Sequence, residues 1–216
     1  MHASFQLPIW FDLGATFAFA LTGALAALKR GYDVVGLISL ALVSGIGGGL
    51  IRDGIFLQQG LTPLLTNPNY LYVIGAAALG GVLLGERVHQ FNRVIAMVDA
   101  LGLGAYACFG VQKSLQAGLG PTAAVLVGVV NAVGGGLLRD VLTREEPLVF
   151  RPGQFYVLVA LAGAVTFVFL TAQLGVSATI AAFAAIGLTF VFRMLTIVFN
   201  WRTGALATVQ KKSAPI

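Results

Sequence analysis

The hydrophobic positions of this chain form seven nearly continuous runs, and polar residues gather in the short stretches between them. A helix that crosses a bilayer core of about 30 Å needs about 20 apolar residues, and the third run is the shortest. Because the apolar residues are continuous rather than alternating, they indicate helices rather than membrane strands. We therefore predict an all-α membrane protein with seven transmembrane helices, near residues 8–28, 34–56, 69–84, 92–115, 121–142, 154–172 and 177–199.

The composition agrees with a membrane environment. Hydrophobic residues make up 58% of the chain and charged residues 10%, and the mean hydropathy is +0.91. A soluble domain has about 25% charged residues, so this chain is not built to face water on all sides. In a soluble protein a net charge of +5 would suggest nucleic acid. We expect no nucleic-acid partner here, because the distribution of the basic residues fits membrane orientation instead.

Basic residues alternate between the two sets of connections. Most of them follow the first, third, fifth and seventh runs: Lys29, Arg30, Arg87, Arg93, Arg144, Arg151, Arg202, Lys211 and Lys212. The opposite connections hold almost nothing basic beyond Lys113. Positive charge favours the cytoplasmic side, so the alternation predicts an external amino terminus and a cytoplasmic carboxyl terminus. The chain would then consist of a single transmembrane domain over 1–201 and a cytoplasmic tail over 202–216, whose lysines would meet anionic headgroups.

A seven-residue phrase occurs twice in the chain. Gly-Gly-Gly-Leu-Ile-Arg-Asp at 47–53 returns as Gly-Gly-Gly-Leu-Leu-Arg-Asp at 134–140. The resemblance extends outward, because residues 12–53 align without a gap on 99–140 with 13 identities in 42 positions. The chain is therefore a tandem duplication followed by one extra run.

The duplication implies an inverted arrangement. Beyond the phrase, a three-residue deletion would restore the register by aligning Tyr72 with Tyr156. The repeats, over about 8–87 and 91–174, each hold three predicted spans, so the second copy enters the membrane from the opposite side. The halves are then related by a pseudo-two-fold axis in the membrane plane, the plan of many transport proteins. The seventh helix, 177–199, lies outside the duplication and could pack at a subunit interface or against lipid.

The repeated glycines lie at membrane depth, about 21 Å along their helices at 1.5 Å per residue. A triple glycine destabilises a helix by about 1 kcal/mol per residue relative to alanine, and non-helical backbone at this depth must be buried in protein or line a watery cavity. The alternative is that glycine only allows two helices to pack closely. We predict kinks whose freed carbonyl oxygens can face a cation, formed by Gly47, Gly48, Gly49, Gly134, Gly135 and Gly136.

A charged Arg-Asp pair follows each triplet, which is costly inside a membrane span. Adjacent residues point about 100° apart on a helix, so we expect each Arg and Asp to pair with a neighbouring span rather than with each other. Two aspartates at equivalent positions of the first and fourth spans are the expected partners. A pore-lining or gating role and a purely structural role both remain open for the whole set: Arg52, Asp53, Arg139, Asp140, Asp12 and Asp99.

Ser44 and Asn131, three residues before the triplets, complete the candidate pore-lining set, although such side chains often bond a neighbouring backbone. The sequence contains no cluster at metal-ligand spacing and no phosphate-binding loop, and it offers no nucleophile beside a base. We therefore expect neither an enzyme nor a metal or cofactor site. Permeant potassium or sodium ions, and bound lipids, would be the ligands.

Two linked Gly-Gly-Gly-x-x-Arg-Asp phrases in a three-plus-three-plus-one chain resemble the prokaryotic branch of the trimeric intracellular cation (TRIC) channel family. The resemblance covers the span region to about Trp201. It implies a homotrimer in a prokaryotic inner (plasma) membrane, with one pore in each subunit for monovalent cations. It also implies that the kinked second and fifth helices line the pore, with the kinks at 47–49 and 134–136. Related bacterial sequences have also been named glycine transporters.

An arginine after each triplet sets a condition on the function. If aspartates neutralise Arg52 and Arg139, freed carbonyls can select cations; otherwise the site would favour an anion or a zwitterion. We therefore place a passive monovalent cation channel first and a secondary carrier of a small solute such as glycine second. A membrane scaffold without transport is the third hypothesis. Saturation of the flux would distinguish a carrier from a channel.

Overall fold

The computed structural model describes residues 6–58, 61–84, 92–151 and 155–201. Within these ranges the chain is helical and contains no strand, so the all-α prediction is confirmed for them. The helices are α1 (Trp10–Lys29), α2 (Val34–Ile51), α3 (Pro63–Thr66), α4 (Asn69–Leu84), α5 (Asn92–Gln116), α6 (Pro121–Leu142), α7 (Tyr156–Val168) and α8 (Ala178–Val198). Two π-helical turns extend α2 and α7, namely η1 (Arg52–Leu57) and η3 (Phe169–Gln173).

Six helices in the described ranges are long and apolar enough to cross a membrane: α1, α2 with η1, α5, α6, α7 with η3, and α8. α4, with 16 residues, falls short of that length, so its role as a seventh span stays a prediction. The orientation also stays a prediction. Much of the basic charge behind it lies outside the described residues, as does the 202–216 tail: Arg87, the Arg93 side chain, Arg202, Lys211 and Lys212.

The first helix of each repeat ends at an equivalent glycine, and the second helix of each repeat begins at an equivalent position. Gly31 and Gly118 follow α1 and α5 with φ of +69° and +88°, a left-handed conformation that glycine adopts without steric cost. Asp33 then caps α2 by accepting a hydrogen bond from the Gly36 N–H over 2.8 Å. Pro121 instead opens α6, where its missing N–H costs no helical bond. The two crossing helices therefore begin at matching places through different local contacts.

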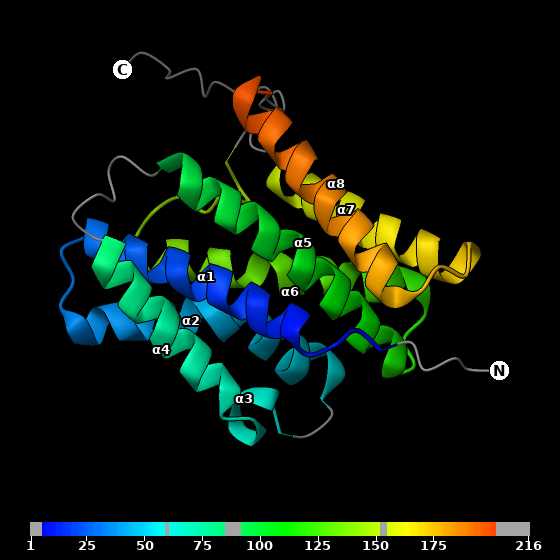
Figure 1. Cartoon of the computed structure of the whole chain (residues 1–216), viewed down its shortest axis with the longest axis horizontal. Coiled ribbons are helices and arrows are strands. Elements are labelled where there is room, and N and C mark those ends of the chain that lie inside the picture. Colours follow the sequence, from blue (N-terminus) through cyan, green and yellow to red (C-terminus); the bar gives the residue numbers. More distant parts are fainter. Residues whose placement is uncertain (1–5, 59–60, 85–91, 152–154, 202–216) are drawn as a thin grey trace, which may run out of the picture.

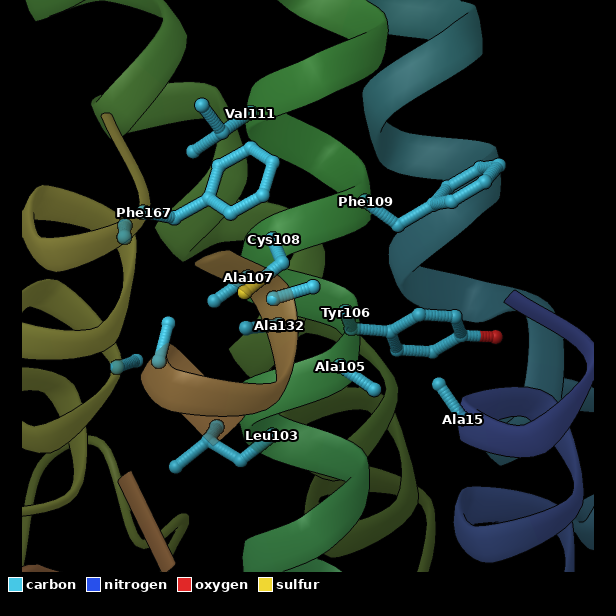
Figure 2. Packing of buried hydrophobic residues seen from close by; sticks show 14 of the residues in the cluster. Ala15, Leu103, Ala105, Tyr106, Ala107, Cys108, Phe109, Val111, Ala132 and Phe167 are labelled. Carbon is cyan, nitrogen blue, oxygen red and sulfur yellow. The ribbon is translucent and has the colours of Figure 1, made fainter. Parts of the chain in front are cut away.

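α5 lies at the centre of the molecule. It packs against α1 of the first repeat and against α6, α7 and α8, while α1 also packs against α2 and α4. Figure 1 shows the blue-to-cyan helices of the first repeat on one side of α5, with α7 and α8 on the other. One hydrophobic cluster lies among α1, α2 and α4, and a second joins α1 to the later helices. Within the second hydrophobic cluster, Tyr106 extends from α5 toward Ala15 of α1 (Figure 2).

The third helix of each repeat corrects the predicted alignment. α4 buries a stripe formed by Tyr70, Ile74, Ala77, Ala78 and Gly81. The buried stripe of α7 includes residues at the same spacing: Tyr156, Ala160, Gly163, Ala164 and Phe167. The alignment of Tyr72 with Tyr156 is wrong, because Tyr72 is 73% exposed. A one-residue deletion aligns Tyr70 with Tyr156 and matches both stripes; a three-residue deletion puts a buried face against an exposed one.

Candidate functional site

The two triple glycines form the place where α2 and α6 cross. A β-carbon added to Gly48 would overlap the carbonyl oxygen of Asn131, and one added to Gly135 would overlap that of Ser44. Gly48 and Gly135 are equivalent in the repeats, and so are Ser44 and Asn131. The contact is therefore reciprocal, and glycine is needed because a side chain would force the two backbones apart.

Both triplets lie within continuous α-helix, so the predicted freeing of backbone oxygens at these positions is wrong. α2 runs through residues 47–49 and α6 runs through 134–136. The N–H of Arg52 bonds to the carbonyls of Gly48 and Gly49, so these oxygens are used inside the helix and are not freed for a cation. The geometry of the first crossing helix changes only afterwards, where the π-helical turn begins at Arg52. Close packing, the alternative role, accounts for the glycines.

The crossing places the two Arg-Asp pairs on opposite sides. Residues 44 and 48 of α2 lie against 135 and 131 of α6, respectively, so the two helices run antiparallel. Each Arg-Asp pair follows its own triplet by about one helical turn. The first pair therefore lies beyond one end of the crossing and the second pair beyond the other end, as expected for an inverted repeat.

Arg52 is buried and binds mainly to its sequence neighbour. Its Nε and Nη2 donate to the two carboxylate oxygens of Asp53 over 2.7 and 2.9 Å, and its Nη1 donates to Oδ1 of Asn131 over 3.2 Å. Asp53 also lies 3.4 Å from Nζ of Lys113, which comes from α5. The expectation that adjacent Arg and Asp would not pair is wrong here, because the long arginine side chain folds back to the next residue.

Arg52, Asp53, Lys113 and the buried Asp12 form the first charged cluster, but the direct bond of Asp12 is not the predicted one. Its carboxylate accepts a hydrogen bond from the hydroxyl of Tyr70 on α4. Arg52 acts on Asp12 electrostatically, and no direct ion pair joins the two within the part of the chain that the structure describes. Tyr70 therefore provides the contact that Arg52 was expected to make.

Arg139 holds the corresponding place in the second charged cluster, which it forms with Asp99 and Asp140. Its Nε donates to Oδ1 of Asp140 over 2.9 Å, so this Arg-Asp pair also bonds internally. Its Nη1 donates to Oδ1 of Asp99 over 3.3 Å and to Oγ1 of Thr22 over 2.9 Å. Asp99 is thus a partner of Arg139, as the repeat predicts, and the two aspartates share one guanidinium.

The two polar residues near the triplets do not form a matching pair of ligands. Nδ2 of Asn131 donates to the carbonyl of Tyr106 over 2.7 Å, while its Oδ1 accepts from Arg52. The Ser44 hydroxyl is buried and has no hydrogen-bond partner among the described residues. Asn131 therefore links α6 to α5 and to the first cluster, whereas Ser44 packs against Gly23 of α1.

Three other side chains near the clusters were not among the predicted site residues. Tyr70 and Lys113 belong to the first cluster, and Arg193 of α8 places its guanidinium carbon 5.0 Å from the ring centroid of Tyr156 in the second. A signal for Arg193 is present, because it is the one charged residue in the run 177–199 and an ionisable residue in a membrane span indicates function. The role of Tyr70 depends on helix register, and the predicted three-residue deletion aligned Tyr72 with Tyr156 instead.

Open space reaches the clusters from both ends of the crossing. At one end, a cavity of about 200 Å³ is lined by Gln6, Tyr70, Gln112 and Lys113, among others. Tyr70 also lines a smaller pocket of about 20 Å³ that includes Asp12, Arg52 and Asp53. At the other end, a cavity of about 340 Å³ is lined by apolar residues together with a group of charged and polar ones: Thr22, Lys29, Asp99, Arg139, Asp140, Glu145 and Arg193.

The rings of Phe19 and Tyr106 lie between the two clusters. These residues are equivalent in the repeats, and their rings stack with centroids 5.4 Å apart and planes inclined by 10°. Phe19 lies between Asp12 and Thr22 along α1, so it separates a residue of the first cluster from one of the second. The Tyr106 hydroxyl donates to the carbonyl of Gly45, which ties α5 to α2 beside the crossing.

A protein family described as "Glycine transporter" matches this chain over residues 9–86 and 96–172, once on each repeat. The chain is 37% identical over 158 residues to a UPF0126 membrane protein of Deinococcus radiodurans, and the aligned region covers 72% of each chain. It is 35% identical over 147 residues to the UPF0126 inner membrane protein YadS of Escherichia coli strain K12, which covers 68% of this chain and 70% of that relative.

The fold is also similar to a solved bacterial structure. The TRIC trimeric intracellular cation channel orthologue from Rhodobacter sphaeroides matches with a TM-score of 0.82 at 33% sequence identity. The match covers 88% of this chain and 97% of that chain. The similarity therefore extends over both repeats and is not confined to the glycine phrases.

Proposed function

This chain belongs to the family described as glycine transporter and has the fold of bacterial TRIC channels. From that premise we propose that it is a passive channel for the monovalent cations potassium and sodium. A neighbour that shares the fold over most of both chains is named a cation channel. The pore would run within each subunit along α2 and α6, because the charged clusters lie at the two ends of that crossing.

The observation that carries the proposal is the neutralisation of both arginines. Arg52 bonds to Asp53 and Arg139 bonds to Asp140 and Asp99. Unpaired, each arginine would repel an entering cation; paired, it leaves carboxylate oxygens that a cation can approach. The neutralisation therefore supports a cation path over an anion path at both ends.

Selectivity would come from these side chains and not from a ring of backbone oxygens, since the triplets remain helical. An ion passing from one cluster to the other would have to pass the stacked rings of Phe19 and Tyr106. Both rings are buried, so conduction requires them to separate. The hydrogen bond from Tyr106 to the carbonyl of Gly45 would hold the closed arrangement.

For the assembly, we propose a homotrimer in a prokaryotic inner membrane, with the amino terminus outside and α4 as a short seventh span. The Rhodobacter sphaeroides neighbour is named trimeric. α4 and α8 expose large apolar side chains that suit lipid or another subunit, among them Leu71, Leu83, Ile180, Phe183, Val191 and Val198.

A carrier of a small zwitterion such as glycine is the second candidate. The description of the matched family favours it. The clusters are also chemically compatible with it, since arginine can bind a carboxylate and aspartate can bind an ammonium group. A carrier would have to alternate between two conformations for each solute, so its flux saturates.

Single-channel recording of the purified full-length protein in planar bilayers with potassium chloride tests the proposal. We expect discrete current steps and a reversal potential near that of potassium in a salt gradient. Asp53→Asn should lower the conductance, most at low ionic strength, because Arg52 and Lys113 lose a compensating charge. Asp33→Asn keeps a good helix cap on an exposed residue and should leave the conductance unchanged. Saturable glycine uptake without current steps would favour the carrier, and the absence of both would overturn the channel.

A further inference from the structure

α8 has no counterpart in the first repeat, yet it brings a charged side chain to the larger cavity. Its buried residues follow one face of the helix: Ala178, Ala181, Ala182, Ala185, Thr189, Arg193 and Thr196. Thr189 lies against Gly163 of α7 and Gly104 of α5, so close packing fixes how α8 is rotated. Arg193 follows about one turn later on the same face and therefore reaches the cavity instead of lipid.

The surroundings of Arg193 hold its charge inside the protein. The residue is 3% exposed, and its guanidinium lies over the ring of Tyr156, an arrangement in which the cation is attracted by the aromatic face. Asp99 interacts electrostatically with Arg193 and forms an ion pair with Arg139 at 3.3 Å. Arg193 and Arg139 thus act on the same carboxylate from different helices.

Arg193 balances the formal charge of the second charged cluster. Without it, the second cluster contains one arginine and two aspartates; with it, the charges cancel. Lys29 and Glu145 also line this cavity, and Glu145 pairs with Arg30 over 2.9 Å. In the first charged cluster, Asp12 and Asp53 likewise exceed Arg52 by one charge. There Lys113 of α5 supplies the second positive charge. Lys113 and Arg193, which do not correspond in the duplication, thus compensate two clusters that do.

We propose that Arg193 is a selectivity-determining residue of the channel, which cancels the excess negative charge of the second cluster and so limits the potassium concentration in the larger cavity. The inference rests on the proposed channel function. A cavity with one uncompensated carboxylate concentrates cations, whereas a neutral cavity does not. The aromatic contact with Tyr156 keeps the compensating charge at a fixed place.

The test is the single-channel conductance of Arg193→Gln in symmetrical potassium chloride. We expect it to rise roughly twofold or more at about 0.01 M salt and to approach the unchanged protein at about 1 M, because the screening length falls from about 30 Å to about 3 Å. The reversal potential in a salt gradient should move toward that of potassium. Arg193→Lys, which keeps the charge, should behave like the unchanged protein.

Arg144→Gln is the matched control, since it removes the same charge from an exposed residue outside the cavity lining; its effect should be much smaller than that of Arg193→Gln. Ile197 also lines the cavity and is 36% exposed, so Ile197→Lys and Ile197→Glu provide a second pair. The lysine should lower the conductance and the glutamate should raise it, even if Arg193→Gln fails to fold.

Two results would overturn the inference while leaving the channel in place. One is an unchanged conductance in folded Arg193→Gln and in both Ile197 variants; the other is a loss that Arg193→Lys shares with Arg193→Gln. If the unchanged protein carries no potassium current, the proposed function fails and the inference fails with it.

Discussion

At the residue scale, the four buried aspartates of the clusters are satisfied in three ways. Asp53 and Asp140 each bind the arginine that precedes them, and Asp99 binds an arginine of another helix. Asp12 instead accepts from the hydroxyl of Tyr70. A buried carboxylate that loses its partner is costly, so Asp12 depends on a neutral donor where the others depend on a cation.

Replacing Tyr70 with phenylalanine should lower the stability of the protein in detergent by about 1–3 kcal/mol, because the buried carboxylate of Asp12 loses its hydrogen-bond donor. Tyr72→Phe is the matched control and should have no measurable effect, since Tyr72 is 73% exposed. Thermal unfolding of the purified variants measures both. A loss confined to Tyr72→Phe would instead support the three-residue alignment of the repeats.

At the scale of secondary-structure elements, the antiparallel crossing of α2 and α6 depends on the absence of side chains. Gly48 and Gly135 each receive a carbonyl of the opposite helix. The neighbouring Gly134 also lies close to Gly48, since a β-carbon added there would be 2.9 Å from the α-carbon of Gly48. Even one methyl group has no space at these positions, whereas Gly14 of α1 and Gly75 of α4 face open space.

Gly48→Ala and Gly135→Ala should each destabilise the protein by about 1–3 kcal/mol or more, because an added methyl overpacks the crossing, and should reduce potassium flux at matched protein amount. Gly75→Ala in α4 is the control. No atom lies within 4 Å of a β-carbon added there, so alanine should be neutral or stabilise by up to about 1 kcal/mol. Thermal unfolding and potassium flux from vesicles measure the two effects. Unchanged flux in both crossing variants would remove the glycines from the mechanism.

The helices could be predicted closely from hydrophobic runs, and the equivalence of the two halves from the repeated phrase. The helical conformation of the two triple glycines could not be predicted from the sequence. Intrinsic propensity costs about 1 kcal/mol per glycine and favours a break, but the packing of Gly48 and Gly135 against opposite carbonyls overrides it. The partners of Arg52 were also out of reach, because they depend on how a long side chain folds. The position of Arg193 required the rotation of α8, which an apolar run does not define.

At the scale of the whole molecule, the connections divide between the two ends of the crossing. Gln116 closes α5 and lines the cavity at the first-cluster end. Glu145, at the opposite end, lines the larger cavity and forms an ion pair with Arg30 over 2.9 Å. The next residue, Glu146, is exposed. These positions mark the two faces that the inverted arrangement assigns to opposite sides of the membrane.

Cysteines introduced one at a time at Gln116 and Glu146 should react with a membrane-impermeant maleimide from opposite sides, Gln116 from outside and Glu146 from inside. Both residues are exposed at their ends of the molecule. The native Cys108 is buried and should remain unlabelled in the unchanged protein, which serves as the control. Labelling of intact cells before and after permeabilisation gives the readout. Reaction of both cysteines from the same side would rule out the inverted topology.

The reciprocal crossing makes the two halves self-complementary. Each repeat offers one glycine that receives a carbonyl and one carbonyl that fills a glycine, which is the definition of an isologous surface. Two polypeptides that each contained a single repeat, inserted in opposite directions, would present both contacts without being covalently joined. Each half therefore carries its complete docking surface on its own side of a cut between residues 84 and 92.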